Sequence, residues 1–293
     1  MKSKSLFKNA FIVMTSVLIS CGTATKKENP QPENPPNIVI IYLDDLGYGD
    51  VSAYGSKAIK TPNIDKLADG GVQFTDGHAS SSTCTPSRYA LLTGQYPWRN
   101  ENAKILPGTA PLLIDTAQMT IPKMLREKGY YTGIVGKWHL GLGSGNVDWN
   151  QRISPGPNEV GFDYAFIMAA TQDRVPTVYI ENGNVVGLEA DDPIQVDYAK
   201  NFEGEPTGKD NPELLTMMWD HGHDNSIVNG ISRIGFMKGG ENAKWIDEDM
   251  ADTFLGKAQQ YVRDHKNSSF LFVLRHATTA CTANTPSSFC GFN

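Results

Sequence analysis

Cysteine is scarce in this chain: the 293 residues contain four, at positions 21, 84, 281 and 290. So few cysteines exclude the disulfide-dense scaffold of a small secreted domain. Cys281 and Cys290 could pair in an oxidising compartment, whereas Cys84 has no evident partner. An unpaired cysteine is most often a small buried apolar residue, so the neighbours of Cys84 must decide its role.

A surplus of basic charge is also missing. The formal net charge is -6 at pH 7, and the sequence pI is about 5.5. DNA and RNA binding need clustered positive charge, so no nucleic acid partner is expected. An acidic chain can still hold a basic pocket, which leaves a small anionic substrate open. The length allows one sizeable core and not two large domains.

The N-terminal segment lacks an apolar run long enough to cross a bilayer. Ala10 to Ile19 are about ten mostly apolar residues, against a hydrocarbon thickness of roughly 30 Å. Lysines precede this run, and together they indicate a signal peptide over residues 1–20. Residues 21–36 are rich in Pro, Asn, Glu and Lys, which predicts a flexible tether before the folded domain at 37–293.

The sequence Leu18-Ile19-Ser20-Cys21 resembles the bacterial lipobox, in which the cysteine carries the lipid. This resemblance implies a periplasmic or outer-membrane lipoprotein of the cell envelope, bound to the membrane only through a lipid anchor on Cys21. A plain secretory signal and an uncleaved anchor are the alternatives.

Helical and strand patterns alternate in the folded domain, which predicts an α/β fold with a largely parallel sheet. The apolar run over 37–43 is typical of a central strand buried on both faces. Residues 143–245 have weak periodicity and are interpreted as long surface loops. The other predicted elements are helices over 63–68, 86–92, 123–128 and 248–265, and strands over 72–75, 131–135 and 270–274.

The strongest chemical signal is the segment Cys84-Thr85-Pro86-Ser87-Arg88, followed by Tyr-Ala-Leu-Leu-Thr-Gly. Pro86 suits the first turn of a helix, so Cys84 is expected just before a helix N-terminus. The unpaired N–H groups and the positive end of the dipole there favour an anion. Arg88, one turn into the helix, can hold a modified side chain by charge-assisted hydrogen bonds.

Two further segments carry polar side chains at the ends of predicted strands. Asp44 and Asp45 follow the first strand, where open α/β sheets bind ligands, and their oxygens suit Ca²⁺ or Mg²⁺. An isolated Asp-Asp pair is more often a turn or a helix cap. Lys137 and His139 lie in Gly136-Lys-Trp-His-Leu-Gly141, where alternation along a strand points both side chains to one face.

Together these segments resemble the signatures of the type I, formylglycine-dependent sulfatases, an arylsulfatase-like family of the alkaline-phosphatase-like superfamily. The resemblance implies that a maturation enzyme oxidises Cys84 to formylglycine. It also implies that Asp44, Asp45 and residue 84 bind calcium, and that the sheet is mixed, largely parallel and flanked by helices. In this family, Lys137 would contact the formylglycine and the sulfate, and His139 would hydrogen-bond the formylglycine hydroxyl.

Three other histidines are weaker candidates. His221 and His223 lie in a His-Gly-His-Asp sequence, for which a plain loop is the alternative to contact with the sugar of the substrate. His276 follows the strand over 270–274, where the family places a histidine that protonates the leaving oxygen.

Part of the family pattern is absent from the sequence. Full-length sulfatases complete the metal site with a later Ser-Asp-Asn-Gly-like element and usually another lysine, and neither is found here. The resemblance covers 36–274, and the tail from about 277 has no apolar pattern. The C-terminal part of the fold is therefore expected to be missing, through truncation or a shifted reading frame.

The sequence thus predicts a sulfatase acting on sulfate esters, with sulfated glycans as the expected partner outside the cell. The motifs do not distinguish galactose, N-acetylhexosamine and uronic acid sulfates. The alternatives are an inactive sulfatase remnant and a phosphatase or phosphodiesterase of the same superfamily. The latter group normally has Ser or Thr as its nucleophile and zinc ligands.

Overall fold

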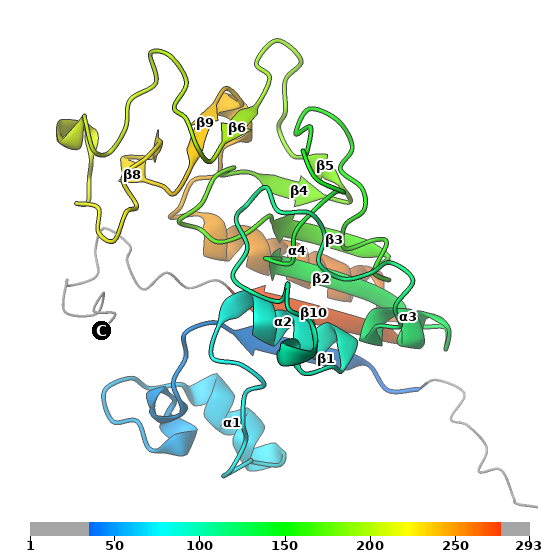
Figure 1. Ribbon diagram of the computed structural model, residues 1–293. Coiled ribbons are helices and arrows are strands. Elements are labelled where there is room, and N and C mark those ends of the chain that lie inside the picture. Colours follow the sequence, from blue (N-terminus) through cyan, green and yellow to red (C-terminus); the bar gives the residue numbers. More distant parts are fainter. Residues whose placement is uncertain (1–34, 277–293) are drawn as a thin grey trace, which may run out of the picture. The chain divides into compact units, whose positions relative to one another are not determined.

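The structure is a computed structural model that describes residues 35–276 (Figure 1). The predicted signal peptide, the lipidation site at Cys21 and the tail from about 277 lie outside the described residues. The described residues from Pro36 onward form one compact unit. Within them, no helix combines the length and the apolar character that a membrane span requires.

Four parallel strands form the core of the main sheet. In spatial order they are β1 (Ile38–Leu43), β10 (Phe270–His276), β2 (Tyr131–Lys137) and β3 (Tyr164–Met168). The antiparallel strands β4 (Tyr179–Glu181) and β5 (Asn184–Val185) continue the sheet beyond β3. The predicted α/β class and the largely parallel sheet are confirmed. Parallel pairing brings the carboxyl ends of β1, β10 and β2 to one edge of the sheet.

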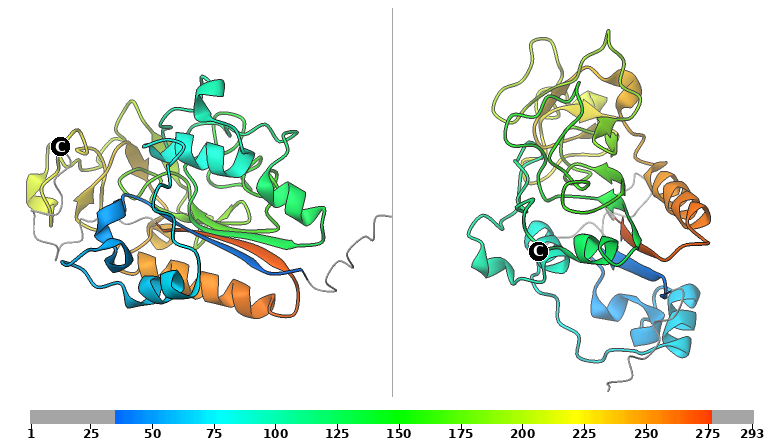
Figure 2. Two further views of the ribbon diagram at one scale, coloured as in Figure 1. Left: turned by 90° about the horizontal axis from the view of Figure 1, so that it is seen from below. Right: turned by 90° about the vertical axis from the view of Figure 1, so that its right-hand side faces the viewer.

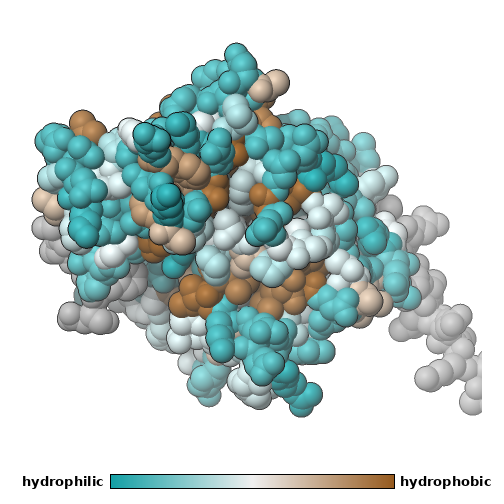
Figure 3. All heavy atoms as spheres, turned by 45° about the horizontal axis from the view of Figure 1, so that its top comes forward, coloured by the Kyte–Doolittle hydropathy of each residue, from teal (hydrophilic) through white to brown (hydrophobic). Residues whose placement is uncertain are grey.

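The helices cover both faces of this sheet (Figure 2). Helices α2 (Cys84–Thr93) and α3 (Ile121–Arg126) pack on one face, where Leu92 belongs to the same buried cluster as Ile134 and Leu271. Helix α4 (Met250–Asp264) packs on the other face through the predicted stripe of Met250, Phe254, Ala258 and Tyr261, all buried. On the face shown in Figure 3, hydrophilic side chains dominate the periphery and apolar ones gather toward the middle.

Shorter elements complete the described chain. Helix α1 (Pro62–Gly70) has no buried residue. The two small antiparallel pairs are β6 (Gln195–Asp197) with β9 (Phe236–Lys238), and β7 (Ile227–Val228) with β8 (Ile231–Ser232). The 3-10 helices are η1 (Tyr48–Asp50), η2 (Ser52–Tyr54), η3 (Pro97–Arg99), η4 (Pro212–Leu214) and η5 (Glu241–Ala243).

The structure corrects the prediction that the first strand is central. Among the described strands, β1 lies at the edge and pairs only with β10. One side of the strand packs on the core through Ile38 and Ile40, whereas Val39 and Ile41 on the other side are 52% and 54% exposed. An apolar run is consistent with burial on both faces, but it does not specify which elements supply the covering.

Other boundaries also differ from the predictions. Residues 72–75 do not form a strand, and Val72 and Phe74 are exposed. Helix α2 begins at Cys84 and not at Pro86, and α3 begins and ends two residues earlier than predicted. Residues 143–245 are not only surface loops, because β3 and β4 lie within them and Phe166 and Ile180 are buried. Short strands between glycine-rich turns give too few residues for a visible period.

Candidate active site

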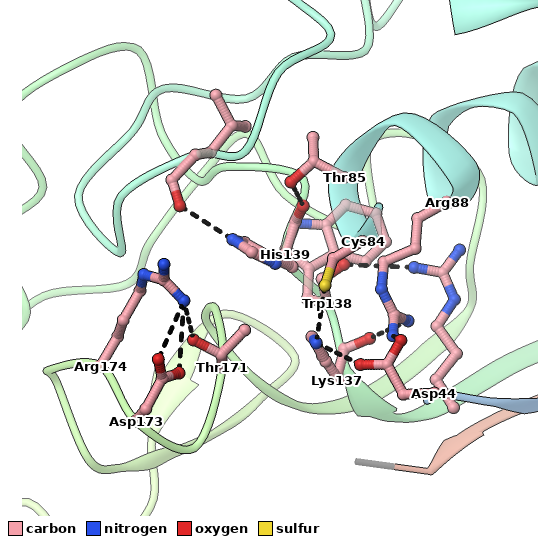
Figure 4. Close-up of polar contacts among 12 residues, drawn as sticks. Asp44, Cys84, Thr85, Arg88, Lys137, Trp138, His139, Thr171, Asp173 and Arg174 are labelled. Atoms are coloured by element: carbon pink, nitrogen blue, oxygen red, sulfur yellow. Dashed lines mark hydrogen bonds and ion pairs between the residues drawn. The ribbon is translucent and has the colours of Figure 1, made fainter. Parts of the chain in front are cut away.

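Three predicted residues meet where β1 and β2 end and α2 begins (Figure 4). Asp44 directly follows β1, Lys137 is the last residue of β2, and Cys84 is the first residue of α2. The parallel pairing of β1, β10 and β2 accounts for this convergence, because it turns the strand ends toward one edge. Ligands bind at this edge in open α/β sheets.

Lys137 lies between the acid and the thiol. Its Nζ donates a hydrogen bond to the carboxylate of Asp44 and lies 3.2 Å from Sγ of Cys84. The Lys137 side chain is only 6% exposed, so water screens its charge poorly. A cation in this position stabilises negative charge that develops on a group attached to residue 84.

Arg88 supports the same cluster from within α2. Its buried guanidinium places Nη2 3.1 Å from Oδ1 of Asp44, and Nη1 donates to the backbone carbonyl of Lys137 at 3.1 Å. Burial acts to raise the pKa of Asp44, but the charges of Arg88 and Lys137 outweigh it and hold the pKa below the ordinary 3.8. Asp44 is therefore an ionised carboxylate at neutral pH.

His139 is held as a neutral imidazole. Its Nε2 lies 2.8 Å from the carbonyl oxygen of Leu106, and because a carbonyl can only accept, Nε2 carries the proton. The other nitrogen, Nδ1, is buried and has no partner among the described residues. Burial, reinforced by the charge of Lys137, lowers the pKa of His139 to about 3. An unsatisfied acceptor of this kind fits a hydroxyl donor.

Positive charge exceeds negative charge around Asp44. Arg275, near the end of β10, is fully buried over the Trp138 ring, with its guanidinium carbon 5.6 Å from the ring centroid. Its Nε and Nη2 have no partner among the described residues, and burial lowers its pKa. Arg88 and Lys137 therefore contact the Asp44 carboxylate directly, and the buried Arg275 is close enough for its charge to interact with those of Arg88 and Asp44. Such a site favours the binding of an anion.

The described residues supply only part of a calcium site. Asp44 is engaged by Arg88 and Lys137, and the side chain of Asp45 is exposed on a backbone with φ of 54°. Nowhere in residues 35–276 do three His, Cys, Asp or Glu side chains gather as they would around a metal ion. Because Ca²⁺ takes six to eight oxygen ligands, these residues alone do not fit a complete calcium sphere.

The structure separates the other predicted histidines. His221 is largely exposed and pairs with Asp220 at 2.7 Å. His223 is partly buried, and its Nε2 lies 3.4 Å from Oδ2 of Asp173. His276 is the last residue of β10, and its side chain lies outside the described part of the chain.

Sequence reasoning missed two charged residues beside His139. Asp173 and Arg174 lie in the loop that follows β3, and their side chains contact each other at 3.2 Å (Figure 4). Arg174 also donates to Thr171 and contributes a positive charge that acts on His139. The polar run Thr171-Gln172-Asp173-Arg174 could have indicated them, because it follows the carboxyl end of a parallel strand. That strand, β3, was not predicted.

Comparison with known proteins agrees with this geometry. The sulfatase family model matches residues 36–278. N-acetylgalactosamine-6-O-sulfatase of Bacteroides thetaiotaomicron is 51% identical over 260 residues, which are 88% of this chain and 51% of that protein. Human arylsulfatase A is 48% identical over 110 residues, 37% of this chain and 22% of that protein.

Solved structures of similar proteins also superimpose on this chain. One from work on glycosaminoglycan metabolism by Bacteroides thetaiotaomicron superimposes with a TM-score of 0.83 at 50% identity, over 86% of this chain and 53% of that one. The crystal structure of Ps i-CgsB superimposes with a TM-score of 0.52 at 25% identity, over 84% and 46% of the two chains. The chain thus spans about half the length, or less, of these relatives.

Proposed function

Because the chain belongs to the sulfatase family, we propose that it hydrolyses sulfate esters through a formylglycine made from Cys84. The observation that carries this proposal is the position of Cys84 at the start of α2, 3.2 Å from Nζ of Lys137 and on the same edge of the sheet as Asp44. A nucleophile at residue 84 would face a cluster of buried cations, which suits a sulfate group.

The surrounding residues have separate tasks in this proposal. Lys137 and Arg88 stabilise the charge that builds up on the sulfate oxygens during transfer. His139, neutral and with an unsatisfied Nδ1, accepts a hydrogen bond from a hydroxyl on residue 84 and orients it. A hydrated formylglycine supplies two hydroxyls, of which one attacks sulfur and the other allows sulfate to be released. Leaving-group protonation by His276 stays a prediction.

Calcium binding, with magnesium as the alternative, belongs to the same proposal. Asp44 and Asp45 would hold such an ion together with residue 84. Further oxygens, such as those of water, backbone carbonyls or amide side chains, would complete the coordination, since residues 35–276 contain no cluster of three His, Cys, Asp or Glu side chains. An ion next to Asp44 would also compete with Lys137 for this carboxylate.

For the substrate, we propose a 6-sulfated N-acetylhexosamine of a glycosaminoglycan. The basis is the 51% identity to an N-acetylgalactosamine-6-O-sulfatase. Asp173, Arg174 and His223 would bind the sugar ring, because Asp173 and Arg174 lie beside His139 and His223 contacts Asp173. His221, exposed and paired with Asp220, would contribute less.

We also propose that the protein acts in the bacterial cell envelope, anchored by a lipid on Cys21. A maturation enzyme that reads the segment around Cys84 is the second expected partner. Labelling with a radioactive fatty acid would test the anchor: the label should appear on the full chain and disappear in Cys21→Ser. Equal labelling of both proteins would contradict the lipidation site.

The sulfatase activity is tested by expressing the chain together with a formylglycine-generating enzyme. Mass spectrometry of the peptide around residue 84 shows whether the thiol has been oxidised, and sulfate release is then measured from 4-nitrophenyl sulfate and from N-acetylgalactosamine 6-sulfate. Cys84→Ser is the matched control, since serine offers one hydroxyl and cannot form the hydrate. We expect sulfate release by the oxidised chain and none by Cys84→Ser.

Three other outcomes would count against the proposal. Oxidation of Cys84 without sulfate release would identify this chain as a non-catalytic sulfatase remnant. Faster cleavage of 4-nitrophenyl phosphate than of the sulfate would favour the phosphatase alternative. Sustained turnover by Cys84→Ser would exclude the formylglycine mechanism.

A further inference from the structure

A buried ion pair lies behind the loop that carries Asp173 and Arg174. Arg233 and Asp247 are 1% and 6% exposed, and their side chains meet in two contacts, Nη2 to Oδ2 at 2.5 Å and Nη1 to Oδ1 at 3.1 Å. Burial acts to raise the pKa of Asp247, but hydrogen bonds from Arg233 and the charge of that residue hold the pKa below its usual value. Both side chains are therefore charged at neutral pH.

The pair is tied directly to the loop after β3. Arg233 Nη1 donates to the backbone carbonyl of Gln172 at 2.8 Å, and Gln172 Nε2 donates to Oδ1 of Asp247 at 2.8 Å. The next residue along, Ile234, donates its backbone N–H to the carbonyl of Asp173 at 2.7 Å and accepts from Val175 at 3.2 Å. Loop residues 172–175 are thus held on both sides of Arg174.

The same arginine holds the segment that carries His223. The backbone of Arg233 exchanges hydrogen bonds with this segment, accepting from Asn225 at 2.9 Å and donating to Ser226 at 2.8 Å. Ser232 donates to the carbonyl of His223. Asp173 and His223 come from segments far apart in the chain, and their 3.4 Å contact lies where these two held segments meet.

Stability alone does not account for such a pair. Removing two charges from water costs several kcal/mol, and replacing a buried pair with apolar residues of similar size is often neutral or stabilising. We propose that Arg233 and Asp247 are positioning residues: they set the geometry of Asp173, Arg174 and His223 toward the sugar of the substrate. The inference rests on the proposed sulfatase function and extends it to substrate selectivity.

The test compares an apolar pair with the native one in the full chain. The double variant Arg233→Met/Asp247→Leu keeps the volume and removes both charges and their hydrogen bonds. The control is Lys257→Met on α4, which removes a partly exposed ion pair with Glu181 of β4. Each protein is assayed with N-acetylgalactosamine 6-sulfate, whose sugar would reach the loop, and with 4-nitrophenyl sulfate, which has no sugar. Amide hydrogen exchange of Val175 and Ile234 is measured in parallel.

We expect the double variant to remain folded and to exchange the amides of Val175 and Ile234 faster than the native chain. We also expect KM for the sugar sulfate to rise about tenfold or more, with little change for the aryl sulfate, since misplacement by about 1 Å can cost as much as 100-fold. Lys257→Met should change neither the amide exchange nor the KM for either substrate. A purely structural pair would instead alter both substrates in parallel.

Unchanged amide exchange at Val175 and Ile234 in the folded double variant would overturn the proposal. An unchanged ratio of the KM values for the two substrates would overturn it as well. If the native chain hydrolyses neither substrate, the proposed function fails, but the exchange measurement still decides whether the pair holds the loop. If the double variant does not fold, Arg233→Lys replaces it in both measurements, because lysine keeps a positive charge beside Asp247 and loses the forked contacts to Gln172 and Asp247.

Discussion

Asp44 is the carboxylate on which the buried cations of the site converge. Arg88 and Lys137 both reach it, and its own side chain is only 13% exposed. Charges removed from water depend strongly on their partners, so the loss of one member leaves the others uncompensated. Asp45, the next residue, is exposed and has no comparable contact with a cation among the described ion pairs.

This contrast gives a matched pair of variants. Asp44→Asn should lower the free energy of unfolding by about 3 kcal/mol, because it leaves Arg88 and Lys137 buried without their carboxylate. Asp45→Asn should change it by about 0.5 kcal/mol or less, as is usual for surface substitutions. Urea denaturation of both proteins measures the difference. Equal destabilisation would show that the Asp44 ion pairs do not stabilise the fold.

A pH dependence follows from His139. Its pKa in the folded protein is about 3, below the ordinary 6.5, so the unfolded chain binds the extra proton throughout this range. The contribution of His139 to the free energy of unfolding is therefore fully present above pH 6.5. It falls by about 1.4 kcal/mol per pH unit as the pH drops from 6.5 toward 3. Asp44 adds to the loss only below pH 3.8, because its pKa is lowered and it is protonated late.

His139→Asn tests this dependence, since asparagine does not titrate and tolerates the positive φ of 50° at this position. Denaturation midpoints measured from pH 7 to pH 4 should fall less steeply for the variant than for the native chain. Identical slopes would show that His139 is not buried as a neutral ring.

At the scale of elements, α2 is fastened to the end of β2 by two hydrogen bonds. Thr85 donates to the carbonyl of His139 at 2.8 Å, and Arg88 donates to the carbonyl of Lys137 at 3.1 Å. These bonds hold the start of the helix beside the strand end, so that Cys84 and Lys137 come within 3.2 Å. The distance depends on how β2 approaches its neighbour β10.

Gly136 permits this close approach. Its φ is 108°, and a Cβ atom there would lie 1.9 Å from the backbone oxygen of Arg275 on β10. Gly136→Ala should therefore destabilise the protein by several kcal/mol, of the order of 3 to 5, because both the backbone conformation and the space are forbidden.

The control is Gly256→Ala on the exposed side of α4, where a Cβ atom meets nothing within 4 Å. Alanine in a helix interior is favoured over glycine by about 0.5–1 kcal/mol, so this variant should be slightly more stable than the native chain. Thermal unfolding followed by circular dichroism ranks the three proteins. A Gly136→Ala protein as stable as the native one would refute the close contact of β2 and β10.

At the largest scale, β1 carries an apolar face that is exposed among the described residues 35–276. Val39, Ile41 and Leu43 are 52%, 54% and 37% exposed, whereas the intervening Ile38 and Ile40 pack against the core. Within the described residues β1 also has a free backbone edge, and an exposed apolar face beside such an edge favours association between chains.

Ile41→Thr should reduce self-association without loss of the fold, since threonine retains the β-branched shape and lowers the exposed apolar area. Ile40→Thr, on the packed side, should instead destabilise the fold because it places a hydroxyl in the core. Light scattering at increasing concentration follows the association, and urea denaturation follows the stability. No difference in association between Ile41→Thr and the native chain would show that the exposed side of β1 does not mediate self-association.

Much of the fold and of the candidate site was predictable from the sequence. The apolar runs at β1 and β10 and the periodic stripe on α4 are clear patterns, and the cysteine, lysine and aspartate segments have distinctive residue orders. Strands β3 and β4 were not predicted, because they are short and lie among glycine-rich turns. Asp173 and Arg174 were missed for the same reason, since their loop is defined only by the strand before it.

The sequence by itself determined which residues are candidates for the chemistry: Cys84 near a helix start, Lys137 and His139 at the end of a strand, and Asp44 after another. Only the tertiary structure decided that Lys137 lies 3.2 Å from Cys84, that His139 is neutral, and that His223 reaches Asp173 while His221 faces Asp220. Local residue order sets the conformation of a segment. Distances, burial and pKa depend on contacts between segments that are remote in the chain, and those exist only after the sheet has formed.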